Sequence, residues 1–462
     1  MEIRVLDART AEGLQARAAG WLRAHGAVEG DRVAVVSEST LDVLVVGLAA
    51  LRTGVVPVLL NPALTAAERS VLLDDARPRL VLGSTDLAAA VEAPGPPSVE
   101  LGRFPRSRPM LYTSGTTGRP KGVWTGLLDE SDAAALVADE ADLWGFTPTD
   151  RHLVLSRLYH SAPFRFAAGT LLAGGEVAMA PDSHDPLGAV RAVRPTTTFA
   201  APVHLQRLLA GARPDDLASF RLVAHAGSPC PTPLKERALG AFPGGAVWEF
   251  YGATEGQFTV CGPDEWRARP GTVGRARPGR TLAVDRDGTI WCRPPAFARF
   301  EYWRDPTKTA ATWREDGSFT VGDLGRLDEA GFLYLDGRRD DLIITGGVNV
   351  YPLEVERVLL DHPGVADAAV FPVDDERWGQ MVCAAVVPTP DDLGAREDEL
   401  RDHVAARLAP YKHPKRWLLV DSLPHTPTGK LRRMELAGRL GLVETDADRV
   451  AGSGTGARAD GS

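Results

Sequence analysis

At 462 residues the chain is too long for one hydrophobic core, so we expect two or more domains. Its 44% hydrophobic and 24% charged residues are typical of a globular protein. The net charge of −9 argues against nucleic-acid binding, which needs a basic surface, and no apolar run approaches the roughly 18 residues of a membrane span. The N-terminus lacks a signal-peptide layout, and the four cysteines form no CxxC pair. We therefore expect a cytoplasmic protein with buried free thiols.

Helical and strand patterns alternate along the first part of the chain. Apolar residues at helical spacing predict helices at 9–25, 41–51 and 65–76, the last capped by Thr65. Short apolar runs predict strands at 31–37, 55–60 and 79–83. This alternation predicts βαβ units and a largely parallel sheet with helices on both faces.

The alternation resumes after residue 130 and changes character near residue 270. We expect helices at 131–144, from 158 through 173, at 186–193 and at 203–210. Strands are expected at 151–156, 176–180, 196–200, 221–227 and 247–252. From about residue 270, short alternating segments between Gly and Pro turns predict a small β-rich subdomain.

The C-terminal part follows a charged break at 337–341. Beyond it the pattern predicts strands at 342–345, 365–372 and 381–388 and helices at 352–360 and 397–408. We therefore predict an α/β protein with a large N-terminal domain over 1–338 and a small α+β domain over 339–443. Residues 444–462 have almost no large apolar side chains and are expected to be a disordered tail.

One stretch, residues 112–122, interleaves glycines with hydroxyl residues and ends on a lysine. Backbone N–H groups, hydroxyls and an ammonium group together suit phosphate oxygens. Its spacing differs from the Walker pattern, and a solvated turn is the plain alternative. The candidate phosphate ligands are Thr113, Ser114, Gly115, Thr116, Thr117 and Lys121.

The stretch resembles the phosphate loop of the adenylate-forming (AMP-binding) superfamily. Further segments resemble that superfamily in the same order along the chain, namely 158–163, 225–230, 250–256, 269–275, 320–325, 337–352 and 427–430. The chain is most similar to bacterial fatty-acid and aryl-acid CoA ligases. This resemblance implies a large N-terminal domain and a small C-terminal domain that rotates between two half-reactions.

The resemblance also implies a reaction and its cofactors. A small carboxylic acid attacks the α-phosphate of ATP, pyrophosphate leaves, and the thiol of CoA then attacks the acyl-adenylate. Glu255 would bind Mg²⁺, Thr254 would touch the α-phosphate and Lys430 would bridge carboxylate and phosphate. The remaining nucleotide ligands implied are Tyr251 stacked on adenine, Asp323 at ribose and Arg338 at ribose or phosphate. Gly227 and Gly252 are implied as cofactor-binding residues and also lie near the expected acyl position. Plainer alternatives are a helix cap for Thr254, a core aromatic for Tyr251, a turn for Asp323 and a solvated Lys430.

The acyl group and CoA are assigned by the same resemblance. His160 matches a gating position, with a histidine packed at a helix start as its alternative. The acyl pocket is expected near Phe164, Arg165, Ala226, Gly227 and Ala253. Arg165 either pairs with a polar or acidic substrate group or points to solvent. Gly346 and Gly347 match the pantetheine tunnel, and Asp340 matches the hinge, with a charged surface turn as its alternative.

Other readings of the same motifs stay open. The acceptor could be a carrier protein or an amine, and relatives that activate nitrite to diazotise an arylamine offer a third chemistry. A non-catalytic nucleotide-binding regulator is disfavoured because Lys430, Glu255 and Asp323 are all present. An amino-acid adenylation domain is disfavoured because its pocket aspartate is missing. The phosphate loop comes earlier than in most relatives, which leaves substrate contacts and a homodimer in doubt.

Overall fold

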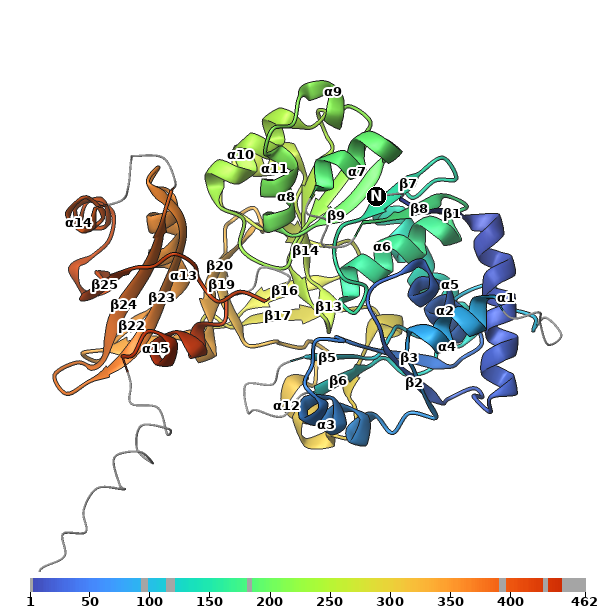
Figure 1. The fold of residues 1–462 in the computed structure, drawn as a ribbon. Helices are drawn as coiled ribbons and strands as arrows, with labels where there is room; N and C mark the ends of the chain where they lie inside the picture. Colours follow the sequence, from blue (N-terminus) through green and yellow to red (C-terminus); the bar gives the residue numbers. More distant parts are fainter. Residues whose placement is uncertain are drawn as a thin grey trace, which may run out of the picture. The chain divides into compact units, whose positions relative to one another are not determined.

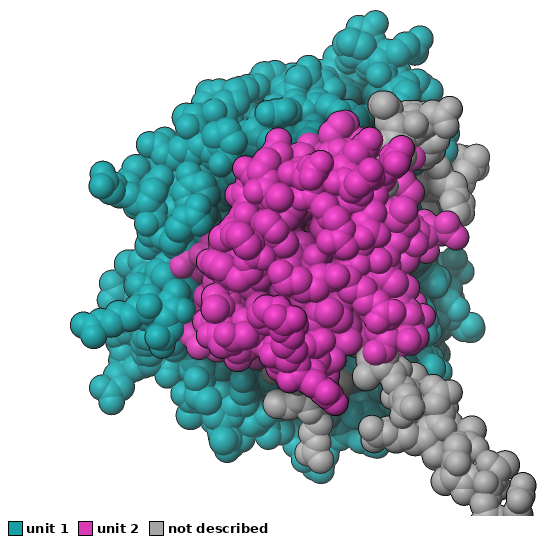
Figure 2. Space-filling view, turned by 90° about the vertical axis from the view of Figure 1, so that its left-hand side faces the viewer, with its two compact units in different colours: residues 1–321, 326–334 teal, residues 322–325, 335–462 magenta. Residues whose placement is uncertain are grey.

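A computed structural model describes residues 3–92, 99–113, 121–180, 185–389, 396–426 and 431–442 (Figure 1). Backbone contacts divide the chain into two compact units (Figure 2). Unit 1 comprises the residues up to 321 together with 326–334, and unit 2 comprises 322–325 and the residues from 335 onward. The predicted boundary after residue 338 stays a prediction, and the predicted tail lies outside the described residues.

The main sheet of unit 1 has the order β1-β8-β7-β9-β10-β11. Its strands are β1 (Val5–Asp7), β7 (Arg151–Val154), β8 (Glu176–Met179), β9 (Thr197–Ala200), β10 (Leu222–His225) and β11 (Val247–Glu249). All run parallel except β1, which pairs antiparallel with β8. No strand was predicted at β1, which is only three residues long.

Helices cover both faces of this sheet, as the alternation predicts. Because neighbouring strand residues point to opposite faces, Val154 packs in one core and Leu153 in another. The first core includes α1 (Ala8–Ala24), α2 (Leu41–Arg52), α4 (Ser84–Glu92) and α6 (Ser161–Leu172). The second includes α7 (Pro186–Val193), α8 (Pro202–Leu209), α9 (Pro214–Leu217), α10 (Thr232–Ala241) and α11 (Pro263–Ala268).

Unit 1 also contains two three-stranded sheets, one parallel and one antiparallel. Parallel strands β2 (Arg32–Val36), β3 (Val56–Leu60) and β4 (Leu80–Leu82) have the order β3-β2-β4. Antiparallel strands β5 (Leu111–Thr113), β6 (Lys121–Trp124) and β18 (Glu301–Tyr302) adjoin them through a bridge between Val58 and Met110. Helix α3 (Ala66–Ala76) begins at Thr65, whose side chain accepts a hydrogen bond from the Glu68 backbone. The predicted Thr65 cap is confirmed.

The predicted β-rich region of short strands is also confirmed. It contains β12 (Gly252–Ala253), β13 (Gly256–Gln257), β14 (Thr259–Val260), β15 (Arg275–Ala276), β16 (Thr281–Val284), β17 (Ile290–Arg293), β19 (Asp323–Leu327) and β20 (Leu333–Arg338). Two further helices of unit 1 are α5 (Glu130–Trp144) and α12 (Pro306–Thr312).

Unit 2 is an α+β domain built on one sheet. Its strands β21 (Ile343–Thr345), β22 (Val348–Val350), β23 (Val365–Asp375), β24 (Gly379–Pro388) and β25 (Arg416–Leu419) have the order β22-β21-β24-β23, with β25 beside β24. Helices α13 (Pro352–Leu360) and α14 (Glu397–Ala405) share a core with one face, and α15 (Leu436–Arg439) packs with the other. The predicted α/β class with a small α+β domain is confirmed.

The four cysteines are free thiols, as predicted, although Cys230 is only partly buried. Within the described ranges, no group of His, Cys, Asp and Glu is arranged to hold a metal ion. None of the described helices combines the length and apolar character needed to cross a bilayer.

Candidate active site

The predicted site residues of unit 1 gather at one edge of the main sheet. Strands β7, β10 and β11 run parallel, so their carboxyl ends meet at the same edge. His160 follows β7, the Ala226–Gly227 turn follows β10, and residues 250–255 follow β11. The chain places β8 and β9 on opposite sides of β7, which makes this edge a topological switch point. Open α/β sheets bind ligands at such points.

Thr254 and Glu255 occupy the tight turn of the β12–β13 hairpin. A Cβ atom on Gly252 would lie 2.5 Å from the carbonyl oxygen of Gly256, so this close hairpin requires glycine. No helix begins at Thr254, which excludes its reading as a helix cap. Tyr251 is buried and packs edge-on against Phe258, with ring centroids 5.0 Å apart.

Glu255 is the buried carboxylate of this edge, with only 6% of its surface exposed. The hydroxyl of Tyr302 donates a hydrogen bond to its Oε1 atom over 2.8 Å. Burial and the Glu255 charge both raise the pKa of Tyr302, so the phenol stays protonated and remains a donor. An ionised carboxylate oriented in this way offers the hard oxygen ligand that Mg²⁺ prefers.

The phosphate loop is bracketed by the β5–β6 hairpin. Thr113 and Lys121 are cross-strand partners, so the two ends of the loop are held together. Ser114, Gly115, Thr116 and Thr117 lie outside the described residues. The Lys121 ammonium lies 5.7 Å from the centre of the Tyr302 ring. Burial and the neighbouring Lys308 charge lower the pKa of Lys121.

The acyl side of the site differs from expectation at α6. Phe164 packs against Gly47 of α2 in the first core and does not share a core with Ala226. Ala226 instead packs with Phe166 and Phe250, whose ring centroids are 6.4 Å apart. Phe166, two residues further on, is the phenylalanine of α6 that shares a core with Ala226, and the assignment of Phe164 to the acyl pocket stays a prediction. Ala253 lies partly exposed in the hairpin.

His160 stands at the start of α6 without capping the helix. Burial, together with the Arg157 charge, lowers its pKa to about 4, so the ring is neutral at pH 7. Its Nε2 atom is buried and has no hydrogen-bond partner. A neutral ring with one uncommitted nitrogen fits either the gating role or the plain packing role.

Arg165 does not point freely to solvent. Its guanidinium pairs with Glu140 over 2.9 Å and lies 5.5 Å from the centre of the Phe250 ring. Burial raises the pKa of Glu140, but the charges of Arg165 and Arg277 outweigh it and lower this pKa to about 2. Arg165 thus already has a carboxylate partner in the protein.

The site residues of unit 2 are described within that unit alone. Arg338 forms an ion pair with Asp323 over 3.2 Å. Asp340 is exposed in a short 3-10 turn (Arg339–Asp341). Gly346 and Gly347 form the β21–β22 turn at φ values of 56° and 80°, where a side chain would be strained.

Lys430 lies outside the described residues, but the chain just beyond it is firmly anchored. The guanidinium of Arg433 pairs with Glu356 of α13 and with Asp341. It also donates a hydrogen bond to the Val370 carbonyl oxygen of β23. Sequence reasoning missed Arg433, as it missed Phe166, Tyr302 and Lys308, because none of them stands in a recognisable motif.

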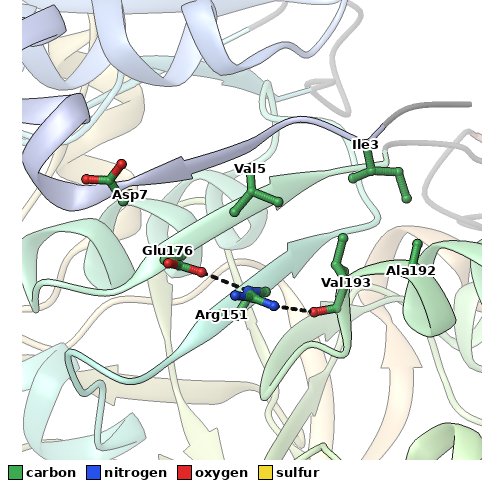
Figure 3. Close-up of a pocket in the computed structure, with 7 residues that line it drawn as sticks. All are labelled: Ile3, Val5, Asp7, Arg151, Glu176, Ala192 and Val193. Atoms are coloured by element: carbon green, nitrogen blue, oxygen red, sulfur yellow. Dashed lines mark hydrogen bonds and ion pairs between the residues drawn. The ribbon is translucent and has the colours of Figure 1, made fainter.

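A surface pocket of about 410 Å³ lies at the opposite end of the main sheet (Figure 3). Its lining residues are Ile3, Val5, Asp7, Arg151, Glu176, Ala192 and Val193. Arg151 and Glu176 begin their strands and pair with each other over 2.8 Å, so this pocket is at the amino ends. No predicted site residue lines this pocket, and Arg151 already pairs with Glu176.

Comparisons with known proteins agree with this geometry. Residues 9–102 and 109–298 match the AMP-binding enzyme family, and 354–430 match the AMP-binding enzyme C-terminal domain. A 2-succinylbenzoate–CoA ligase of Geobacillus kaustophilus is 34% identical over 93% of this chain and 92% of its own length. A fatty acid–[acyl-carrier-protein] ligase, ScoC of Streptomyces coeruleorubidus, is 32% identical over 92% of this chain and 89% of its own.

Solved structures give the same result for the fold. The O-succinylbenzoate coenzyme A synthetase of Bacillus subtilis, in complex with ATP and a magnesium ion, superposes with a TM-score of 0.79. It is 28% identical, and the match covers 92% of this chain and 93% of that one. These matches confirm the predicted resemblance to adenylate-forming CoA ligases. With both domains matched in order over nearly its whole length, the chain belongs to the AMP-binding enzyme family.

Proposed function

We propose that the chain is an AMP-forming acid–thiol ligase that joins a small carboxylic acid to CoA in two steps. The observation that carries this proposal is the gathering of His160, Ala226 and Glu255 at the carboxyl edge of one parallel sheet. A buried carboxylate and a nearby ammonium group at the same edge suit a nucleoside triphosphate. Mg²⁺ bound at Glu255 would neutralise phosphate charge.

In the first step a carboxylate oxygen bonds to the α-phosphorus of ATP, and pyrophosphate departs. Thr113, Lys121 and the intervening loop hold the β- and γ-phosphates, and Thr254 contacts the α-phosphate. The acyl group lies against Ala226, Phe166 and Phe250, which form one core at this edge. Since phosphoryl transfer needs positioning and charge stabilisation, no covalent protein intermediate is required.

The residues of unit 2 are assigned from the family's reaction, each within its own unit. Asp323 and Arg338, already paired with each other, bind the ribose, and Lys430 bridges the carboxylate and the α-phosphate. Asp340 serves as the hinge, and the Gly346–Gly347 turn lets the pantetheine arm pass close to the backbone. Replacing Lys430 is expected to abolish adenylation while sparing thioester formation from preformed adenylate.

A second candidate keeps the adenylate and changes the acceptor to a carrier-protein phosphopantetheine. The relative named as a fatty acid–[acyl-carrier-protein] ligase favours it. The thiol is the same in both cases, so only the carrier differs. A cytoplasmic location and a homodimer remain predictions.

The test is pyrophosphate and AMP release from Mg-ATP across a panel of carboxylic acids, with and without CoA, with products identified by mass. An acyl-CoA product supports the CoA ligase. Adenylate without thioester moves the proposal to the carrier protein or an amine. If no acid causes pyrophosphate or AMP release while ATP still binds, acid activation is contradicted. Nitrite with arylamines would then be the next substrates to test.

A further inference from the structure

Two ammonium groups meet beside the phosphate loop. The Lys121 ammonium lies 5.7 Å from the centre of the Tyr302 ring, and the Tyr302 N–H is hydrogen-bonded to Thr309, the neighbour of Lys308. Burial and the Lys308 charge lower the pKa of Lys121, while the charges of Asp305 and Glu255 act in the opposite direction. Among the described residues, neither lysine forms an ion pair with these or other carboxylates. Like charges in contact repel, so this arrangement costs free energy unless an anion lies against both.

The backbone fixes Lys308 in this place. Strand β18 pairs with β6, and the Trp303 N–H donates to the Gly122 carbonyl oxygen over 2.7 Å. Helix α12 follows at once, and the Asp305 carboxylate caps it by accepting from the Lys308 N–H over 2.8 Å. The Thr309 hydroxyl accepts from the Tyr302 N–H, which joins helix and strand. Lys308 is therefore held against the strand that begins with Lys121.

An ordinary solvated lysine is the plain alternative, and other cations of unit 1 argue against it. Lys235, which is fully buried, pairs with Glu249 over 3.2 Å. Arg277 and Arg280 both pair with Asp139. These three cations are paired with carboxylates inside the protein, whereas Lys121 and Lys308 form no ion pair among the described residues and only the charges of Asp305 and Glu255 favour the Lys121 ammonium.

We propose that Lys308 is a second phosphate-binding lysine, which with Lys121 binds the pyrophosphate end of ATP. The inference rests on the proposed function and adds a substrate-binding residue to it. As the carboxylate oxygen bonds to the α-phosphorus, the bond to the bridging oxygen breaks and its electron pair leaves with pyrophosphate. The leaving group gains negative charge, and two adjacent ammonium groups stabilise it more than they stabilise bound ATP.

Calorimetric titration of the full chain with Mg-pyrophosphate and, separately, with AMP tests the inference. The variant Lys308→Met keeps the length of the side chain and removes its charge. We expect its pyrophosphate affinity to fall about 10- to 100-fold, the loss of one charge-assisted contact, with AMP affinity unchanged. Lys308→Arg should recover most of the loss. Arg286→Met, at an exposed turn of unit 1, is the matched control and should behave as wild type.

Wild-type pyrophosphate affinity in Lys308→Met would overturn the inference. Equal losses for AMP and pyrophosphate would also overturn it, because they indicate general damage to the site. If the variant does not fold, acetylation of the wild-type Lys308 amine decides instead, since Mg-pyrophosphate should slow it and AMP should not. Pyrophosphate binding needs no carboxylic acid, so a failure of the proposed acid activation would be seen separately.

Discussion

Two groups of charged residues in unit 1 are built in opposite ways. The arginine cluster (Arg165, Arg277, Arg280, Asp139 and Glu140) is partly to fully buried, and each of these arginines forms an ion pair with a carboxylate. The phosphate-side cations, Lys121 and Lys308, form no ion pair in the described chain, although the charges of Asp305 and Glu255 act on Lys121. The first arrangement stabilises the fold and leaves nothing for a ligand. The second arrangement lowers the stability of the fold at a place where an anion is bound. The substitutions that follow test this difference between the two groups of charges.

The largest effect is expected from breaking the arginine cluster with Arg277→Met. Arg277 is 1% exposed and contacts Asp139 and Glu140, so its loss removes a buried partner of both carboxylates and leaves each with one arginine, Arg280 or Arg165. Removing one partner of a buried pair costs about 3–5 kcal/mol, seen as a lower urea midpoint. Arg286→Met is again the control. A loss below about 1 kcal/mol, the ceiling for a surface pair, would contradict the structural role of the cluster.

In contrast to Arg277→Met, Glu255→Gln should cause a large loss of activity and little change in stability. The amide keeps the shape but cannot hold Mg²⁺ as a carboxylate does. We expect acid-dependent pyrophosphate release to fall about 100- to 1,000-fold, with the melting temperature close to wild type. A variant that unfolds as readily as Arg277→Met would instead show that Glu255 serves the fold.

Tyr302→Phe should have a smaller effect on the same group. It removes the hydrogen bond to Glu255 and leaves the ring in place. We expect the KM for Mg-ATP to rise about tenfold, because hydrogen bonds to charged groups are worth roughly 1.5–3 kcal/mol. Tyr411→Phe, at a side chain that is 43% exposed in unit 2, is the control. Equal KM values in both variants would show that Tyr302 does not position Glu255.

The smallest effect concerns acid unfolding. The pKa of Glu140 is lowered to about 2 in the folded chain from an ordinary value of 4.5. Its contribution to stability is complete above pH 4.5 and is lost as the pH falls toward 2. Glu140→Gln should therefore show a shallower fall in stability between these two pH values. An unchanged slope would mean that the arginines do not hold this carboxylate ionised.

Long, strongly patterned elements were predictable from the sequence. Helix α13 (Pro352–Leu360) has the predicted bounds because proline starts it and its apolar spacing is regular. Strands β9 (TTFA) and β10 (LVAH) are short, β-branched or apolar for most of their length, and buried throughout. The short strands β1 and β25 carried too little pattern, and no element was predicted for the nine residues of α4.

The site was predictable only where motifs mark it. Glu255 and Lys121 stand in recognisable segments. Glu255 lies with His160 and Ala226 at the carboxyl edge of the main sheet. Tyr302 and Lys308 come from a segment far along the chain, and only the β6–β18 pairing brings them to Lys121. The packing of Phe164 against Gly47 of α2 could not be predicted from the sequence, because the phase of a helix is set by the elements that pack against it.

The most direct test of the account is isotope exchange between labelled pyrophosphate and ATP, catalysed by the wild-type chain with one acid at a time. Reversible adenylation predicts label in ATP only when a substrate acid is present, and no requirement for CoA. Hydrolysis of ATP to ADP and phosphate, or exchange that ignores every acid, would contradict it.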